Sequence, residues 1–108
     1  MNKLSDLEAT ITYHSASTSK IEAHLLLSGR ICNSSHASYL RMIVDILKEG
    51  DTNTCVLDMR DVTFLNTSGI KCLEKICKKN DFIKQIIGLD EFLTSIVRKA
   101  KSALLKLL

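Results

Sequence analysis

Apolar and polar side chains alternate at period two in two segments near the start of the sequence. From Ile21 to Leu27 every second residue is apolar, which predicts a half-buried β-strand. A shorter strand is expected from Ala9 to Tyr13, and the polar run His14 to Lys20 between the two strands predicts a hairpin loop. This part of the sequence therefore predicts a β-hairpin.

The period changes to that of an amphipathic helix in the next segment. Apolar residues recur at spacings of three and four, Ser34 or Ser35 is a suitable N-cap, and Gly50 is a suitable C-terminal residue. A second helix is expected from Ser68 to Lys79 and a third from Asp90 to Leu108, each with one apolar stripe. The three stripes predict helices that each cover part of a core.

Two further apolar runs lie between these helices. Thr54 to Met59 is almost continuously apolar, which is typical of a strand that helices cover in a parallel or mixed sheet. Phe82 to Leu89 predicts another strand. The order β-β-α-β-α-β-α predicts an α/β fold in which helices pack on a small mixed β-sheet, and we expect residues 1–108 to form a single domain.

Composition and charge narrow the functional classes. Hydrophobic residues make up 45% and charged residues 25%, as in a soluble globular protein. The net charge of +3 and the scattered aromatic residues argue against nucleic-acid binding. We expect no secretory signal and no integral membrane segment, because no apolar run has the length that either requires. The four cysteines are not closely paired, which favours a reducing compartment, and we expect a cytoplasmic protein.

Signatures of catalysis and of metal binding are weak in this sequence. Cys72 and Cys77 fall on different faces of the predicted helix, and no C-x-x-C or H-x-x-x-H spacing occurs. His14, His24 and His36 fall on a loop, a strand and a helix start, so no triad is indicated. We therefore expect no enzymatic activity, no metal and no cofactor.

The start of the second helix is the most informative position for chemistry. Thr67 and Ser68 are both of the residue type that caps a helix, because a hydroxyl oxygen accepts a bond from a free amide of the first turn. Those amides and the helix dipole also stabilise a phosphoryl group. The pattern is thus compatible with capping alone or with a phosphorylation site.

The run VLDMRDVTFLNTSGIKCLEKI, preceded by LLLSG at the end of a predicted strand, resembles the STAS domain family of bacterial anti-sigma factor antagonists. The resemblance covers Ile21 to Lys79. It implies a STAS-like fold and a non-enzymatic regulator that acts by partner switching. The implied phosphoacceptor is Thr67, with Ser68 as second choice. The implied partners are a histidine-kinase-like Ser/Thr kinase, which doubles as the anti-sigma factor, and a phosphatase.

The partner-binding surface expected from this resemblance surrounds the same helix start. Its residues are Phe64, Leu65, Asn66, Gly69, Lys71 and Lys75. The lysines at 71, 75, 78 and 79 share one helix face, which is either simply solvated or meets an acidic partner.

Two alternatives stay open at this point. Asn66 stands where the family has an aspartate, and no aspartate follows Gly29, which favours a constitutive accessory subunit of a transporter or ATPase without phosphorylation. The cationic amphipathic pattern of Asp90 to Leu108 is compatible with an apolar stripe that packs on the core or with a helix that lies on an acidic membrane.

Overall fold

The computed structural model describes residues 6–17 and 19–108, and its centre is one four-stranded sheet in the order β1-β2-β3-β4. The strands are Leu7–Ser17 (β1), Lys20–Ile31 (β2), Thr54–Leu65 (β3) and Ile83–Ile87 (β4). β1 pairs with β2 antiparallel, whereas β2, β3 and β4 run parallel. The sheet is therefore mixed, with the hairpin at one side and β4 at the other.

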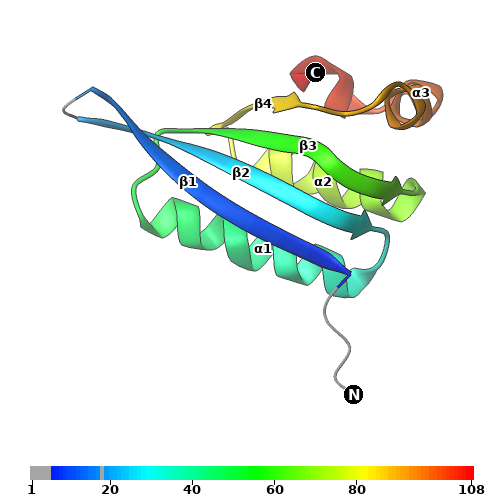
Figure 1. The fold of residues 1–108 in the computed structure, drawn as a ribbon, viewed down its shortest axis with the longest axis horizontal. Coiled ribbons are helices and arrows are strands. Elements are labelled where there is room, and N and C mark those ends of the chain that lie inside the picture. The colour runs from blue at the N-terminus through cyan, green and yellow to red at the C-terminus, as the bar shows by residue number, and fades with distance from the viewer. Residues whose placement is uncertain (1–5, 18) are drawn as a thin grey trace.

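Two helices connect the parallel strands, and two more follow β4. They are Ser34–Glu49 (α1), Thr67–Lys79 (α2), Glu91–Lys99 (α3) and the short 3-10 helix Ala103–Leu107 (η1). Figure 1 shows α1 and α2 along one face of the sheet, with α3 and the C-terminal turn on the β4 side. The element order matches the predicted β-β-α-β-α-β-α. Within the described ranges no helix combines the length and apolar character needed to cross a bilayer.

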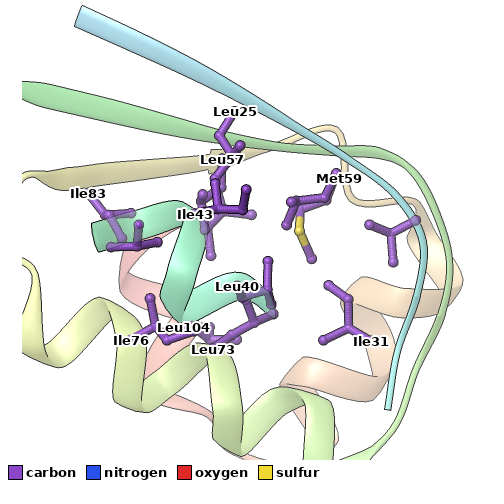
Figure 2. Packing of buried hydrophobic residues seen from close by; sticks show 14 of the residues in the cluster. Leu25, Ile31, Leu40, Ile43, Leu57, Met59, Leu73, Ile76, Ile83 and Leu104 are labelled. Atoms are coloured by element: carbon purple, nitrogen blue, oxygen red, sulfur yellow. The ribbon is translucent and has the colours of Figure 1, made fainter. Parts of the chain in front are cut away.

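The core lies between the sheet and the two helices on its face (Figure 2). Alternate side chains of β2 and of the first part of β3 point inward, as Leu25 and Leu57 do, and they meet Leu40 of α1 and Leu73 of α2. Leu104 of η1 packs beside α2 at the edge of this core. This packing fixes the position of both helices against the strand ends from which they start.

The register of β2 and β3 brings two strand-to-helix turns together. Ile31 pairs with Leu65, and these are the last residues of their strands. The pairing shifts between Leu26 and Ser28 and again after Gly29, so β3 holds extra residues opposite β2. Because both strands end at one paired position, the turns that lead into α1 and α2 lie side by side.

Several predicted strand boundaries were wrong. The expected hairpin loop His14 to Lys20 is strand up to Ser17, and Thr18 lies outside the described residues. β2 continues through Gly29, whose φ of +110° would be strained with any side chain. β3 continues six residues beyond Met59, because its bulges change which residues face the core and interrupt the apolar pattern.

The predicted continuous helix from Asp90 to Leu108 was also wrong. α3 ends at Lys99, and Lys101 adopts a left-handed conformation with φ of +52°. Ser102 then caps η1 and donates its hydroxyl to the Glu74 carboxylate at 2.6 Å. This contact with α2 turns the chain back onto the domain, which the local apolar stripe does not reveal.

Candidate functional site

The turn between β3 and α2 is held by Asn66. Its side-chain oxygen accepts the amide of Gly69 at 2.9 Å, and its side-chain nitrogen donates to the carbonyl of Cys32 at 3.3 Å. The N-cap of α2 is therefore Asn66, not Thr67 or Ser68 as expected. The second bond joins this turn to the one between β2 and α1, so one side chain fixes both.

Gly69 lets α2 approach β2 closely. A Cβ atom at this position would lie 1.9 Å from the carbonyl oxygen of Ile31. Leu65, the last residue of β3, is 2% exposed. Both residues were expected in the partner-binding surface, but they are buried and support the site from within.

Thr67 and Ser68 occupy the first turn of α2 and are both exposed. Within the described ranges neither hydroxyl makes a hydrogen bond, because Asn66 already supplies the cap. No acidic residue lies in the first turn. Two accessible hydroxyls thus stand at the positive end of a helix, where a phosphoryl group would be stabilised electrostatically.

An aromatic residue and a cation lie at the ends of the two strands that precede the turns. The guanidinium carbon of Arg30 lies 4.9 Å from the centroid of the Phe64 ring, and Arg30 pairs with Phe64 across the strands. Phe64 is 41% exposed, so its ring combines apolar area with a neighbouring positive charge. Thr63 donates its hydroxyl to the carbonyl of Gly29 at 3.2 Å and ties the same two strands.

The neighbouring turn repeats the capping arrangement of the first. Asn33 caps α1 by accepting the amide of His36 at 2.9 Å, so the expected caps Ser34 and Ser35 were wrong. The imidazole of His36 is buried, and its Nδ1 accepts the amide of Cys32 at 3.1 Å. Ser34 and Ser35 are exposed in the first turn, as Thr67 and Ser68 are in theirs.

The exposed face of α2 continues from the site as a row of lysines. Lys71 lies one turn after Thr67, where it can reach a phosphate on that residue, and Lys75 lies one turn further. Both side chains are exposed, as are Lys78 and Lys79. The face therefore presents positive charge from the site toward the end of the helix.

A buried carboxylate supports β3 before it reaches the site. Asp58 Oδ2 lies 2.8 Å from His24 Nε2 and 3.3 Å from Arg60 Nε, and Oδ1 accepts the amide of Arg60 at 3.1 Å. Burial alone would raise the pKa of Asp58, but these hydrogen bonds and the nearby positive charges lower it below its ordinary value. The cluster anchors the first bulge of β3.

The remaining cysteines show no sign of activation. Burial raises the pKa of Cys55 to about 12 and that of Cys77 to about 11, and burial also raises the pKa of Cys72. All three thiols therefore stay protonated at neutral pH. Across the described part of the chain, no three His, Cys, Asp or Glu side chains gather where a metal ion could be held.

Two residues of the site were not singled out from the sequence. Arg30 and Cys32 reach it from a strand and turn far away in sequence, through the register of β2 and β3. A signal was present, since Asn33-Ser-Ser-His36 and Asn66-Thr-Ser-Gly69 follow their strands with the same capping pattern. That repetition could have indicated two equivalent turns.

Comparison with known proteins agrees with this architecture. The STAS domain family model matches residues 11–82, a range that contains α1, α2 and both turns. A crystal structure from Shewanella loihica PV-4, described as an uncharacterized protein from the DUF3478 family with a SpoIIAA-like fold, is similar with a TM-score of 0.57. The sequences are 15% identical, and the likeness covers 94% of this chain and 81% of that chain.

No curated protein matches the chain. The likeness to the Shewanella structure concerns the fold alone. The family match spans more than half of the residues and includes the strand, turn and helix that hold Asn66, Thr67 and Ser68. This chain therefore belongs to the STAS domain family.

Proposed function

We propose that the chain is a non-enzymatic, cytoplasmic protein-binding regulator that docks through the first turn of α2, and that phosphorylation of Thr67, or secondarily of Ser68, weakens that docking. The partners would be a histidine-kinase-like Ser/Thr kinase, which is itself the docking partner, and a phosphatase. The observation that carries the proposal is the pair of exposed hydroxyls in the first turn of α2, which form no hydrogen bond within the described residues and follow the exposed Phe64 closely in the chain. Membership of the STAS family supports it.

Phosphorylation of Thr67 would change the surface charge at this turn without changing the fold. Asn66 caps the helix whether or not Thr67 is modified. A phosphate adds about −1.5 to −2 charges at pH 7, and the helix dipole together with Lys71 would stabilise it. The added charge would therefore act on the partner, by repulsion and by desolvation cost at the interface, and not by melting α2.

The docking surface that we propose combines an aromatic anchor with flanking cations. Phe64, packed under Arg30, has the character of an interface hot spot, and Lys71 and Lys75 extend the surface along α2. Leu65 and Gly69 would act from beneath, by holding Phe64 and the first turn of α2 in position.

The test is capture of the partner from native cells by tagged protein, followed by affinity measurement with four forms of the chain. Wild type and Thr67→Ala should bind equally, and Thr67→Glu should bind at least about tenfold more weakly because one charge enters the interface. Thr12→Glu on β1 adds the same charge at an exposed position away from α2 and should change affinity by less than about twofold. Unchanged binding by Thr67→Glu, together with no added phosphate on wild type, would refute the proposed switch.

A second candidate function is a constitutive accessory subunit of a transporter or ATPase, which uses the same surface without modification. The geometry of Asn66 favours it, because both ends of its amide are engaged in holding the turns and it offers no carboxylate for phosphoryl transfer. The intact mass of protein from native cells separates the two candidates. A single population without phosphate under all growth conditions favours the accessory subunit.

A further inference from the structure

The C-terminal half of α2 and the segment after α3 enclose a groove of about 860 Å³. Exposed lysines from both elements line it: Lys75, Lys78, Lys101 and Lys106. Lys78 lies eleven residues after Thr67, which corresponds to about 16 Å along the helix axis. The groove is thus distinct from the first turn of α2, and it shares Lys75 with the docking surface proposed above.

The lining of this groove between the lysines is largely apolar. Leu104 is buried, and Cys77 and Leu107 are half-buried beside it. Burial and the nearby Cys72 raise the pKa of Cys77 to about 11, so its thiol stays neutral. The groove therefore combines an uncharged floor with positively charged edges.

The two acidic residues of the lining, Glu74 and Asp81, offset only half of the charge of the four lysines. Oε2 of Glu74 accepts the Ser102 hydroxyl at 2.6 Å and the Ala103 amide at 3.1 Å, so this carboxylate holds the C-terminal segment in place. Asp81 is the other acidic residue of the lining. In residues 6–17 and 19–108, none of the four lysines forms an ion pair or a side-chain hydrogen bond.

The clustering of charge results from the break after α3. The left-handed backbone at Lys101 and the Glu74–Ser102 hydrogen bond turn the segment back, which brings Lys101 and Lys106 opposite α2. A non-glycine residue in this conformation is uncommon, and like charges at short distance repel. The fold thus gathers four cations around an apolar floor, although a continuous helix would have separated them.

We propose that this groove binds an acidic, amphipathic segment of a protein partner, with apolar side chains on the floor and carboxylates against the lysines. Charge complementarity identifies the partner as acidic. The recessed floor favours a protein segment over a bilayer, because a flat membrane can meet the lysines but cannot reach half-buried Cys77 or Leu107. Lys75 also lines a second groove, together with Arg41, Lys48 and Lys79, so the positive surface continues beyond the first groove.

The test uses a fluorescent acidic peptide of about four helical turns with repeated Glu-Leu-Leu-Glu blocks, a matched peptide with Gln in place of every Glu, and phosphatidylglycerol vesicles. Binding is followed by anisotropy, and the site is mapped from amide shifts of ¹⁵N-labelled full chain. Lys78→Glu and Lys106→Glu should each weaken binding of the acidic peptide at least about fivefold, whereas Lys20→Glu, an equal charge change at the far hairpin, should change it by less than about twofold. The Gln peptide should bind at least about tenfold more weakly.

The largest amide shifts should fall at Cys77, Leu104 and their neighbours. The proposal is overturned if the acidic peptide does not bind, if Lys20→Glu weakens binding as much as Lys78→Glu, or if the shifts map elsewhere. It is also overturned in favour of a membrane surface if vesicles bind through the same lysines and the peptide does not. None of these results depends on phosphorylation of Thr67, so this site stands or falls independently of the proposed switch.

Discussion

The turn from β2 into α1 and the turn from β3 into α2 share a capping pattern but differ in the residue that lies beneath the turn. Each begins with an asparagine cap and two exposed hydroxyl residues, Ser34 and Ser35 in the first turn and Thr67 and Ser68 in the second. The residue three positions after the cap differs. In the first turn it is the buried imidazole of His36, and in the second it is Gly69.

This difference decides what each turn contributes to the surface. His36 fills the space under the first turn and holds the amide of Cys32. Gly69 leaves no side chain, so α2 approaches the carbonyl of Ile31 and Asn66 reaches Cys32. The same capping pattern therefore produces two different turns. The first packs on a buried histidine side chain, whereas the second is held by the close approach of α2 to β2 and by the bond from Asn66 to Cys32. The second turn directly follows the strand end that carries Phe64.

The largest loss of stability should follow from a substitution that gives Gly69 a side chain. In Gly69→Ala the new Cβ would lie 1.9 Å from the Ile31 carbonyl oxygen, and backbone cannot move aside as a side chain can. We expect a loss of about 3 kcal/mol in the free energy of unfolding. Urea denaturation measures it, with Gly50→Ala as the control, because a Cβ there meets nothing closer than 3.5 Å. Equal stability of the two variants would contradict the close approach.

The next largest loss of stability should follow from removal of either asparagine cap, and its size should differ between the two. Asn33→Ala removes one capping bond and should cost about 1 kcal/mol. Asn66→Ala also removes the bond to the Cys32 carbonyl and should cost about 2 kcal/mol. Chemical denaturation of both variants tests the difference, and a smaller loss for Asn66→Ala would show that the link between the turns contributes nothing.

The sequence predicted the order of elements and the positions of α1 and α2, because their apolar spacing reflects burial against one sheet face. It did not predict the end of β3, since bulges shift which residues face the core after Met59. The caps could not be assigned either. Three consecutive residues of capping type precede Gly69, and only the bond from the Gly69 amide to the Asn66 side chain identifies the cap.

The exposure of Thr67 and Ser68 was within reach of sequence reasoning, because a helix start after a buried strand places first-turn residues at the surface. The contribution of Arg30 was not, since it depends on the pairing of two strands. The return of the C-terminal segment onto α2 was equally hidden, because it rests on the contact between Glu74 and Ser102. Contacts between distant segments account for what was missed.

The next loss of stability should be smaller and should depend on pH. It concerns β3, the strand that leads into the second turn. β3 carries the bulge that Asp58 anchors, and the pKa of Asp58 is lowered in the folded state. A lowered folded pKa stabilises the protein above the unfolded pKa of about 3.9, and this contribution disappears as pH falls through the folded value. The stability difference between wild type and Asp58→Asn should therefore shrink in acid below about pH 4, as thermal melts would measure. A constant difference from pH 7 to pH 2 would contradict this, and Asp61→Asn, at an exposed position of β3, is the control.

The smallest effect on stability should come from the hydroxyls themselves. Thr67 is exposed and does not cap α2, so Thr67→Ala should change the free energy of unfolding by less than about 0.5 kcal/mol. Ser34→Ala, at the equivalent position of the first turn, should behave in the same way. A loss above about 1 kcal/mol for Thr67→Ala alone would mean that its hydroxyl is structural, which conflicts with its proposed role.

Phosphosite mapping of the chain purified from its native cells would show directly whether the second turn, and not the first, is the modified one. Both turns offer exposed hydroxyls at a helix start, so each molecule contains its own control. We expect phosphate on the peptide that contains Thr67 and Ser68, and none on the peptide that contains Ser34 and Ser35. Phosphate confined to the first turn, or absent from both turns in every growth condition, would contradict this expectation.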